Sequence, residues 1–257
     1  MNFCHKFVLF FAFLLSPIAV LSAANWVNEH LQLLSEEEQK CLNHLFAKAI
    51  KEDHLGHVLF FSNKPGCLTG AFLNKDPLFI KGWNVWKEKE YLFPHPNFII
   101  HNELFGKEKE ILHIYFINKN TFSHLLKAEE NRLKRLYGRQ FSKGYLIKCL
   151  ERDEFHLFKK DEALMGLLLG FGLESAVAFK QKLKCLEPIF CADEGKIIPY
   201  QDLVIINGVI PVSFAGNPDS EEVKHLQKIY ADELNKIEML YQETDLLESV
   251  LDALCSI

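Results

Sequence analysis

The segment ALMGLLLGFGLESAVAF, residues 163–179, decides how the C-terminal half of this chain folds. It has three interpretations: part of a membrane span, a glycine loop that holds a phosphate, or a break between two packed helices. Charged residues at 161, 162 and 174 leave only eleven residues between them, whereas a membrane helix needs about 20. A phosphate loop follows a strand, but the residues before the glycines are strong helix formers without a β-branched side chain. The segment therefore predicts a buried helix that ends at Gly170 or Gly172 and restarts at Glu174.

Glycines shape this predicted break in two ways. Gly166 and Gly170 lie on one face of the first helix and lack the side chains that would keep another helix away. Gly172 can adopt the positive φ that ends many helices. We expect close helix packing at the first pair and a helix C-cap at Gly172.

The N-terminus has the parts of a secretory signal peptide. A basic residue precedes the apolar run Phe7–Leu15, and the small residues Ser22 and Ala24 occupy the −3 and −1 positions of a cleavage site. We expect residues 1–24 to be removed and the mature chain to be exported, either to the periplasm or out of the cell. A lipoprotein would carry a cysteine where this chain has Ala24, so we expect neither a lipid anchor nor a transmembrane span in the mature chain.

Composition indicates a folded domain without a nucleic-acid partner. The chain of 257 residues is 49% hydrophobic and contains 22 phenylalanines, which is enough apolar surface for a sizeable core. Its formal net charge of −5 argues against nucleic-acid binding, because the phosphate backbone attracts basic proteins.

The first half of the mature chain contains helices and pairs of strands. Ser35 and Glu38 form a capping box at the start of a helix. The segment HVLFFSNKPGCLTGAFL, residues 57–73, has two apolar runs around the turn sequence NKPG, which predicts a β-hairpin. A helix and a second predicted hairpin, with strands in 97–104 and 110–118, follow.

The second half is predicted to be mainly helical. Residues 186–216 are expected to be irregular apart from a strand at 203–206. From 218 to 254 apolar residues recur at helical spacing, which predicts one long helix. Its other face is acidic, with ten Asp or Glu against three Lys between residues 219 and 252. The apolar stripe either packs on its own domain or contacts a protein partner of unknown identity.

These elements predict an α+β fold: a small antiparallel sheet of two hairpins with flanking helices, then a helical half with a long C-terminal helix. No linker rich in Pro, Gly or Ser interrupts the chain. We predict a single domain over residues 25–257, which can be subdivided into an α+β part (25–118) and a mainly helical part (119–257).

The cysteines have two interpretations. In an oxidising compartment Cys185 and Cys191 are close enough in sequence to form a disulfide. Cys41, Cys149 and Cys255 lie within apolar helical patterns, where free buried thiols are common. No C-x-x-C or H-E-x-x-H spacing is present, so we expect neither a metal site nor a cofactor.

Candidate site residues are few. No G-x-S-x-G elbow occurs, and Cys67 beside the NKPG turn, with His57 on the facing predicted strand, is the best nucleophile and base pair. The structural alternative is a packed hairpin cysteine and an exposed strand histidine. The candidate binding residues are Lys64, Pro65, Trp83, Trp86, Gly170 and Gly172.

Three motifs carry a resemblance to a known group. LFFSNKP (59–65), GWNVW (82–86) and EALMGLLLGFGLESAVAF (162–179) resemble uncharacterised exported proteins of Chlamydia-like and Legionella-like intracellular bacteria. The likeness covers about residues 55–180, and this chain departs from the pattern at Ser175, where the group has Asn. The resemblance implies export by a bacterium that lives inside host cells, and it implies no activity and no catalytic residue.

The sequence therefore favours a non-enzymatic interaction module or envelope-associated module of an exported bacterial protein. The export signal, the lack of a catalytic signature and the long acidic helix support this interpretation. A secreted hydrolase with a Cys/His site that the sequence does not make obvious is the alternative.

Overall fold

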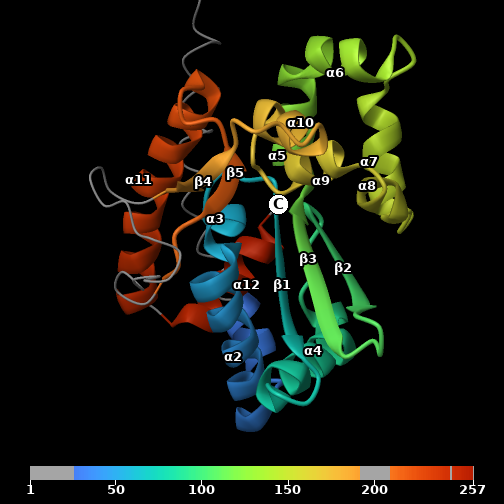
Figure 1. The fold of residues 1–257 in the computed structure, drawn as a ribbon. Coiled ribbons are helices and arrows are strands. Elements are labelled where there is room, and N and C mark those ends of the chain that lie inside the picture. The colour runs from blue at the N-terminus through green and yellow to red at the C-terminus, as the bar shows by residue number, and fades with distance from the viewer. Residues whose placement is uncertain (1–25, 192–208, 244, 257) are drawn as a thin grey trace, which may run out of the picture.

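The computed structural model describes residues 26–191, 209–243 and 245–256 (Figure 1). The predicted signal peptide, residues 1–24, and the predicted strand at 203–206 lie outside these ranges. Within them the fold is α+β, as predicted, with a small antiparallel sheet and helices at the C-terminus.

The elements follow each other in the order that Figure 1 shows. The part up to residue 118 contains α2 (Glu36–Asp53), α3 (Leu55–Phe60), β1 (Gly66–Phe72), α4 (Pro77–Lys89), η1 (Glu90–Leu92), β2 (Phe98–Phe105) and β3 (Ile111–Asn118). The helical segment contains α5 (Lys119–Ala128), α6 (Glu130–Tyr137), α7 (Lys143–Glu151), α8 (His156–Lys159), α9 (Glu162–Leu168) and α10 (Leu173–Lys180). The chain continues with β4 (Glu187–Phe190), β5 (Ser213–Gly216), α11 (Glu221–Glu243) and α12 (Leu246–Cys255).

Helix α2 begins at the predicted capping box. The Ser35 hydroxyl accepts from the backbone N–H of Glu38 at 3.3 Å, and the Glu38 carboxylate accepts from the backbone N–H of Ser35 at 2.7 Å. The helix ends at His54, whose left-handed φ of 69° turns the chain into α3. The reciprocal bonds satisfy two orphan donors and fix where α2 starts.

The first predicted hairpin is wrong, because residues 55–60 form helix α3. Five of its six residues are buried, so the sequence shows no alternation between a solvent-exposed and a buried face. A short apolar run of this kind cannot be assigned to helix or strand from its periodicity. Strand β1 pairs instead with β3, and the sheet order is β1-β3-β2.

Strand β3 is shared by two hydrophobic cores. Its predicted hairpin with β2 is confirmed, and the pairing is antiparallel over the whole of both strands. Successive side chains of a strand point to opposite faces. Ile114 and Phe116 accordingly pack with α2 and α4, whereas Tyr115 and Ile117 pack with the helices of the 119–180 segment. The sheet therefore connects both halves of the described chain.

The break in the 163–179 segment is confirmed. Helix α9 ends at Leu168 and α10 starts at Leu173. A Cβ atom at Gly166 would lie 2.8 Å from the Cβ of Ala176, so the missing side chain allows the close packing of α10 on α9. Gly172 has the expected positive φ, at 79°, but it precedes α10 as its N-cap residue.

The predicted long C-terminal helix is two helices. The carboxylate of Asp245 accepts from the backbone N–H of Leu247 at 3.1 Å and caps a separate α12. The apolar stripe is buried against the rest of the chain, at Val223, Tyr230, Leu234, Ile237, Leu247, Val250, Leu251 and Leu254. These residues of the stripe pack on their own domain.

Residues 186–216 were predicted to be irregular, but in part they form a second sheet. β4 and β5 pair antiparallel, with Ile189 opposite Phe214. Among the helices within the described ranges, none is long and apolar enough to cross a membrane.

Gly82 allows the closest contact between α4 and α2. A Cβ atom there would lie 2.4 Å from the carbonyl oxygen of Cys41 and 2.9 Å from the Cβ of Leu45. We expect Gly82→Ala to lower the free energy of unfolding by about 1–3 kcal/mol, because the helices must move apart. Chemical denaturation measures this change.

Gly144 in α7 provides the matched control. The nearest atom to a Cβ there, the Ser142 hydroxyl oxygen, is 3.9 Å away. We expect Gly144→Ala to raise the free energy of unfolding by up to about 1 kcal/mol, because alanine is the better helix former. Equal effects of the two substitutions would contradict the close contact at Gly82.

Candidate functional site

A buried lysine lies against the break between α9 and α10. Lys64 is only 1% exposed, and its ammonium donates to the carbonyl oxygen of Leu169. The Nζ atom lies 5.0 Å from the ring centroid of Phe171 and 5.4 Å from that of Tyr230. One carbonyl and two aromatic rings thus surround a charge that has been removed from water.

The geometry of the helix end makes that carbonyl available. The backbone N–H of Phe171 donates to Gly166 at 3.0 Å and that of Gly170 donates to Leu167 at 3.1 Å, which is a Schellman motif with Gly170 at φ 80°. The last carbonyls of a helix have no intrahelical donor. Here the carbonyl of Leu169 accepts from Lys64, and that of Gly170 accepts from the Tyr230 hydroxyl at 2.6 Å.

A buried carboxylate lies near the lysine. Glu233 of α11 is 3% exposed and accepts from Asn63 at 2.6 Å and from Nδ1 of His57 at 2.7 Å. Burial lowers the pKa of Lys64 from its ordinary 10.5 to about 8, and the nearby Glu233 opposes that shift. The turn before β1, the α9–α10 break and α11 are thus joined by one polar cluster.

The predicted catalytic pair does not form a nucleophile–base arrangement. His57 lies on helix α3, with Nδ1 on Glu233 and with no partner for Nε2. Cys67 is buried, and burial raises the pKa of its thiol well above the ordinary value. A thiol that stays protonated is a poor nucleophile. No hydrogen bond joins His57 and Cys67 in the described part of the chain.

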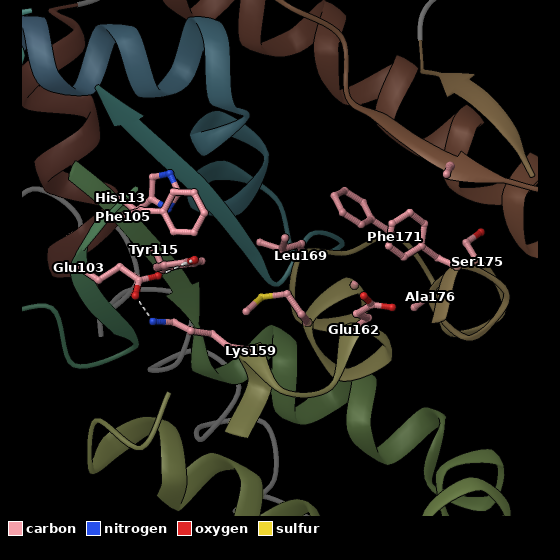
Figure 2. Close-up of a pocket in the computed structure, with 14 residues that line it drawn as sticks. Glu103, Phe105, His113, Tyr115, Lys159, Glu162, Leu169, Phe171, Ser175 and Ala176 are labelled. Atoms are coloured by element: carbon pink, nitrogen blue, oxygen red, sulfur yellow. Dashed lines mark hydrogen bonds and ion pairs between the residues drawn. The ribbon is translucent and has the colours of Figure 1, made fainter. Parts of the chain in front are cut away.

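A cavity of about 420 Å³ opens between the sheet and the α9–α10 pair (Figure 2). Figure 2 shows aromatic and polar residues of β2 and β3 on one side and residues of α9, α10 and the break on the other. The lining residues are Glu103, Phe105, His113, Tyr115, Lys159, Glu162, Met165, Gly166, Leu169, Phe171, Ser175, Ala176, Phe179 and Ala215. Most of this surface is apolar, as in small-molecule sites.

The polar groups of the cavity lie at separate places. On the sheet side, Glu103 pairs with Lys159 and accepts from the Tyr115 hydroxyl at 3.1 Å. On the helix side, Ser175 is 2% exposed, and its hydroxyl is buried without a hydrogen-bond partner. Glu162 is exposed on the first turn of α9. An unpaired buried hydroxyl is costly.

The lysine cluster and the cavity share a wall. Leu169 and Phe171 line the cavity and are also the residues that contact the Lys64 ammonium. The short glycine segment therefore separates a buried charge from a cavity on its other side.

The other predicted binding residues have structural positions. Trp83 and Trp86 are buried in the core with α2, and Trp86 packs edge-on against Phe46 with ring centroids 5.5 Å apart. Pro65 is buried and accepts from the backbone N–H of Asn118 at 2.8 Å. Gly170 and Gly172 supply the positive φ angles of the break. Lys64, Pro65 and Gly170 come together, whereas Gly172 lies against Leu226 and Glu222 and the tryptophans lie in the other core.

The six described cysteines are all free thiols. Cys185 is exposed and Cys191 is buried, so the disulfide predicted between them is not formed in the structure. Within the described ranges, no three His, Cys, Asp or Glu side chains are placed to hold a metal ion.

Two important residues were missed in the sequence. Glu233 was assigned to the acidic outer face of the C-terminal helix, although its position three residues after Tyr230 of the apolar stripe is a signal that it could point inward. Ser175 was noted only as a departure from a pattern. Comparisons of the chain with family models, with curated proteins and with solved structures return no match.

Lys64→Met should change how stability depends on pH. Between pH 8 and 10.5 the unfolded chain keeps the Lys64 proton while the folded protein, with the pKa of Lys64 lowered to about 8, releases it. Stability rises with pH wherever the unfolded state binds more protons. Relative to that of Lys64→Met, the free energy of unfolding of the wild type should therefore increase by on the order of 3 kcal/mol between pH 8 and pH 10.5.

Denaturant unfolding of both proteins at a series of pH values measures this difference. Lys81→Met, which removes an exposed lysine of α4, is the control. A difference between wild type and Lys64→Met that stays constant from pH 8 to 10.5 would contradict the burial of the ammonium.

Ser175→Ala tests whether the unpaired hydroxyl is costly. The substitution removes a buried group that has no partner, so it should leave the free energy of unfolding unchanged or raise it by up to about 1 kcal/mol. Ser220→Ala is the matched control, because that hydroxyl donates to Glu174 at 2.8 Å and caps α11. It should lower the free energy of unfolding by about 1 kcal/mol. Thermal and denaturant unfolding compare the two, and equal losses would show that Ser175 has a partner.

Proposed function

We propose that this chain is an exported, non-enzymatic binding module that holds a small, largely apolar ligand in the cavity between the sheet and α9–α10. The observation that carries the proposal is the cavity itself, whose lining is mostly apolar. Concave, mostly apolar cavities with a small number of polar groups are typical small-molecule sites.

The size and the lining of the cavity support this function. Its volume of about 420 Å³ falls within the range of small-molecule sites, roughly 300–1,000 Å³. Phe105, Phe171 and Phe179 supply apolar contact area, and few polar groups interrupt it. A ligand of this kind would gain most of its affinity from apolar burial and its orientation from the few polar groups of the lining.

Export is part of the same proposal. It is supported by the signal-peptide pattern of residues 1–24 and by the resemblance to exported proteins of intracellular bacteria. An envelope-associated or secreted binding module is consistent with both.

The hydrolase alternative has less support. It depends on Cys67 and His57, and the thiol is buried and protonated while the imidazole is bonded to Glu233. Binding of a protein partner through the apolar stripe of 218–254 also has less support, because that stripe lies in the core.

A cavity-filling substitution tests the binding function. Ala215 lines the cavity from β5, and Ser213 is exposed on the same face of the same strand. N-phenyl-1-naphthylamine, a neutral apolar fluorophore, should bind the wild type saturably. Ala215→Trp should weaken that binding by on the order of tenfold, and Ser213→Trp should leave it within about twofold.

The titration of fluorescence measures both affinities, and circular dichroism confirms that both variants fold. If the wild type binds neither this fluorophore nor 4-phenylbutylamine, 4-phenylbutanol or 4-phenylbutyrate, the proposed function is overturned. Equal weakening by the two tryptophans would place the fluorophore elsewhere on the molecule.

A further inference from the structure

We infer that the cavity selects organic cations, that is, ligands with an apolar or aromatic body and an amine or ammonium group. This inference rests on the proposed function and concerns the class of ligand. It follows from the charges and the ring surfaces that face the cavity.

The charges that line the cavity do not balance. Glu103 and Lys159 neutralise each other in an ion pair on the sheet side. Glu162 has no cation paired with it among the residues that the structure describes. Burial lowers the pKa of His113, which favours its neutral form near pH 7. The lining therefore carries one uncompensated negative charge, at Glu162.

The Lys64 ammonium, on the far side of Leu169 and Phe171, already has partners within the protein. Lys64 lies beyond Leu169 and Phe171, and the buried carboxylate of Glu233 lies close enough to oppose the effect of burial on the pKa of that lysine. The ammonium also occupies one face of the Phe171 ring. Lys64 therefore does not supply a free positive charge for an anionic ligand.

Aromatic rings add to the preference for a cation. Phe105 and His113 stack with ring centroids 4.9 Å apart, and Tyr115 and Phe179 line other parts of the wall. The face of an aromatic ring is negative and attracts ammonium groups. An anion would instead meet a carboxylate and several negative ring faces.

The helix N-termini close to the cavity give no free anion site. At α9 the Asp161 carboxylate already accepts from the backbone N–H groups of Ala163 and Leu164. The N-terminus of α10 carries a partial positive charge, which would favour an anionic group. The carboxylate of Glu222 already accepts from the backbone N–H of Glu174 there, at 2.7 Å. Arg132 in turn binds that same carboxylate group at 3.2 Å. This end of the helix is occupied by the chain itself.

Three probes of similar shape test the inference: 4-phenylbutylamine, 4-phenylbutanol and 4-phenylbutyrate. Each is titrated against the protein saturated with N-phenyl-1-naphthylamine, at low salt and at 0.5 M salt. The amine should displace the fluorophore at about tenfold lower concentration than the alcohol, and the carboxylate should be the weakest. Salt should reduce the advantage of the amine, because Glu162 is exposed.

Glu162→Gln should remove most of the preference for the amine, a loss of about three- to tenfold, and leave the affinity for the alcohol unchanged. Glu187→Gln is the matched control, since it removes one exposed carboxylate from β4, outside the cavity. It should leave the order of the three probes unchanged.

The outcomes separate this inference from the proposed function. If the three probes displace the fluorophore equally, or if the carboxylate is strongest, the inference is wrong and the binding function stands. If Glu187→Gln abolishes the preference as fully as Glu162→Gln does, the preference comes from the net charge of the protein and the inference is also wrong. If the wild type does not bind the fluorophore and none of the probes binds when titrated directly by calorimetry, the proposed function itself fails.

Discussion

The hydrogen bond from the buried Lys64 ammonium to the carbonyl of Leu169 is the constraint on which the rest of this structure depends. A charge that has left water must be surrounded by partners, because an unpaired buried charge is far more costly than any single packing defect. The partners of Lys64 come from the α9–α10 break and from α11, which are distant in sequence. These contacts hold the turn before β1, the break and α11 against one another.

The cavity is a consequence of that placement combined with small residues. Gly166, Ala176 and Ala215 form part of its wall and leave space that larger side chains would fill. Aromatic side chains of β2 and β3 form the opposite side (Figure 2). The contact between α9 and α10 at Gly166 is too close for any side chain there. Neither helix can shift into the cavity without losing its packing against the other. A large empty volume in a protein this apolar is thus maintained by the backbone rather than by mobile side chains.

Local chemistry in the sequence predicted much of this fold. The capping box at Ser35, the β2–β3 hairpin and the break at Gly170 all follow from interactions within a few residues, and all are present. Helix α3 was missed because its apolar residues are covered on every side, which removes the periodic signal. The same limit applies to the site. Glu233 belongs to an acidic segment, and only its contacts with His57 and Asn63, about 170 positions away, give it a buried role.

The motifs that suggested a relationship now have a physical interpretation. The Lys-Pro turn and the glycine break are far apart in the chain, yet Lys64 donates to Leu169 and Pro65 approaches Gly170 so closely that a Cβ there would lie 3.1 Å from its ring. A change in either motif would leave the other with an unmatched charge or a clash. The Gly-Trp-x-x-Trp motif serves the other core, where Gly82 allows α4 to approach α2 and Trp86 fills the space beside Phe46. Two of the three motifs are therefore halves of one contact, and that contact forms the wall of the cavity. A sequence that keeps both halves therefore keeps the wall between the buried lysine and the cavity.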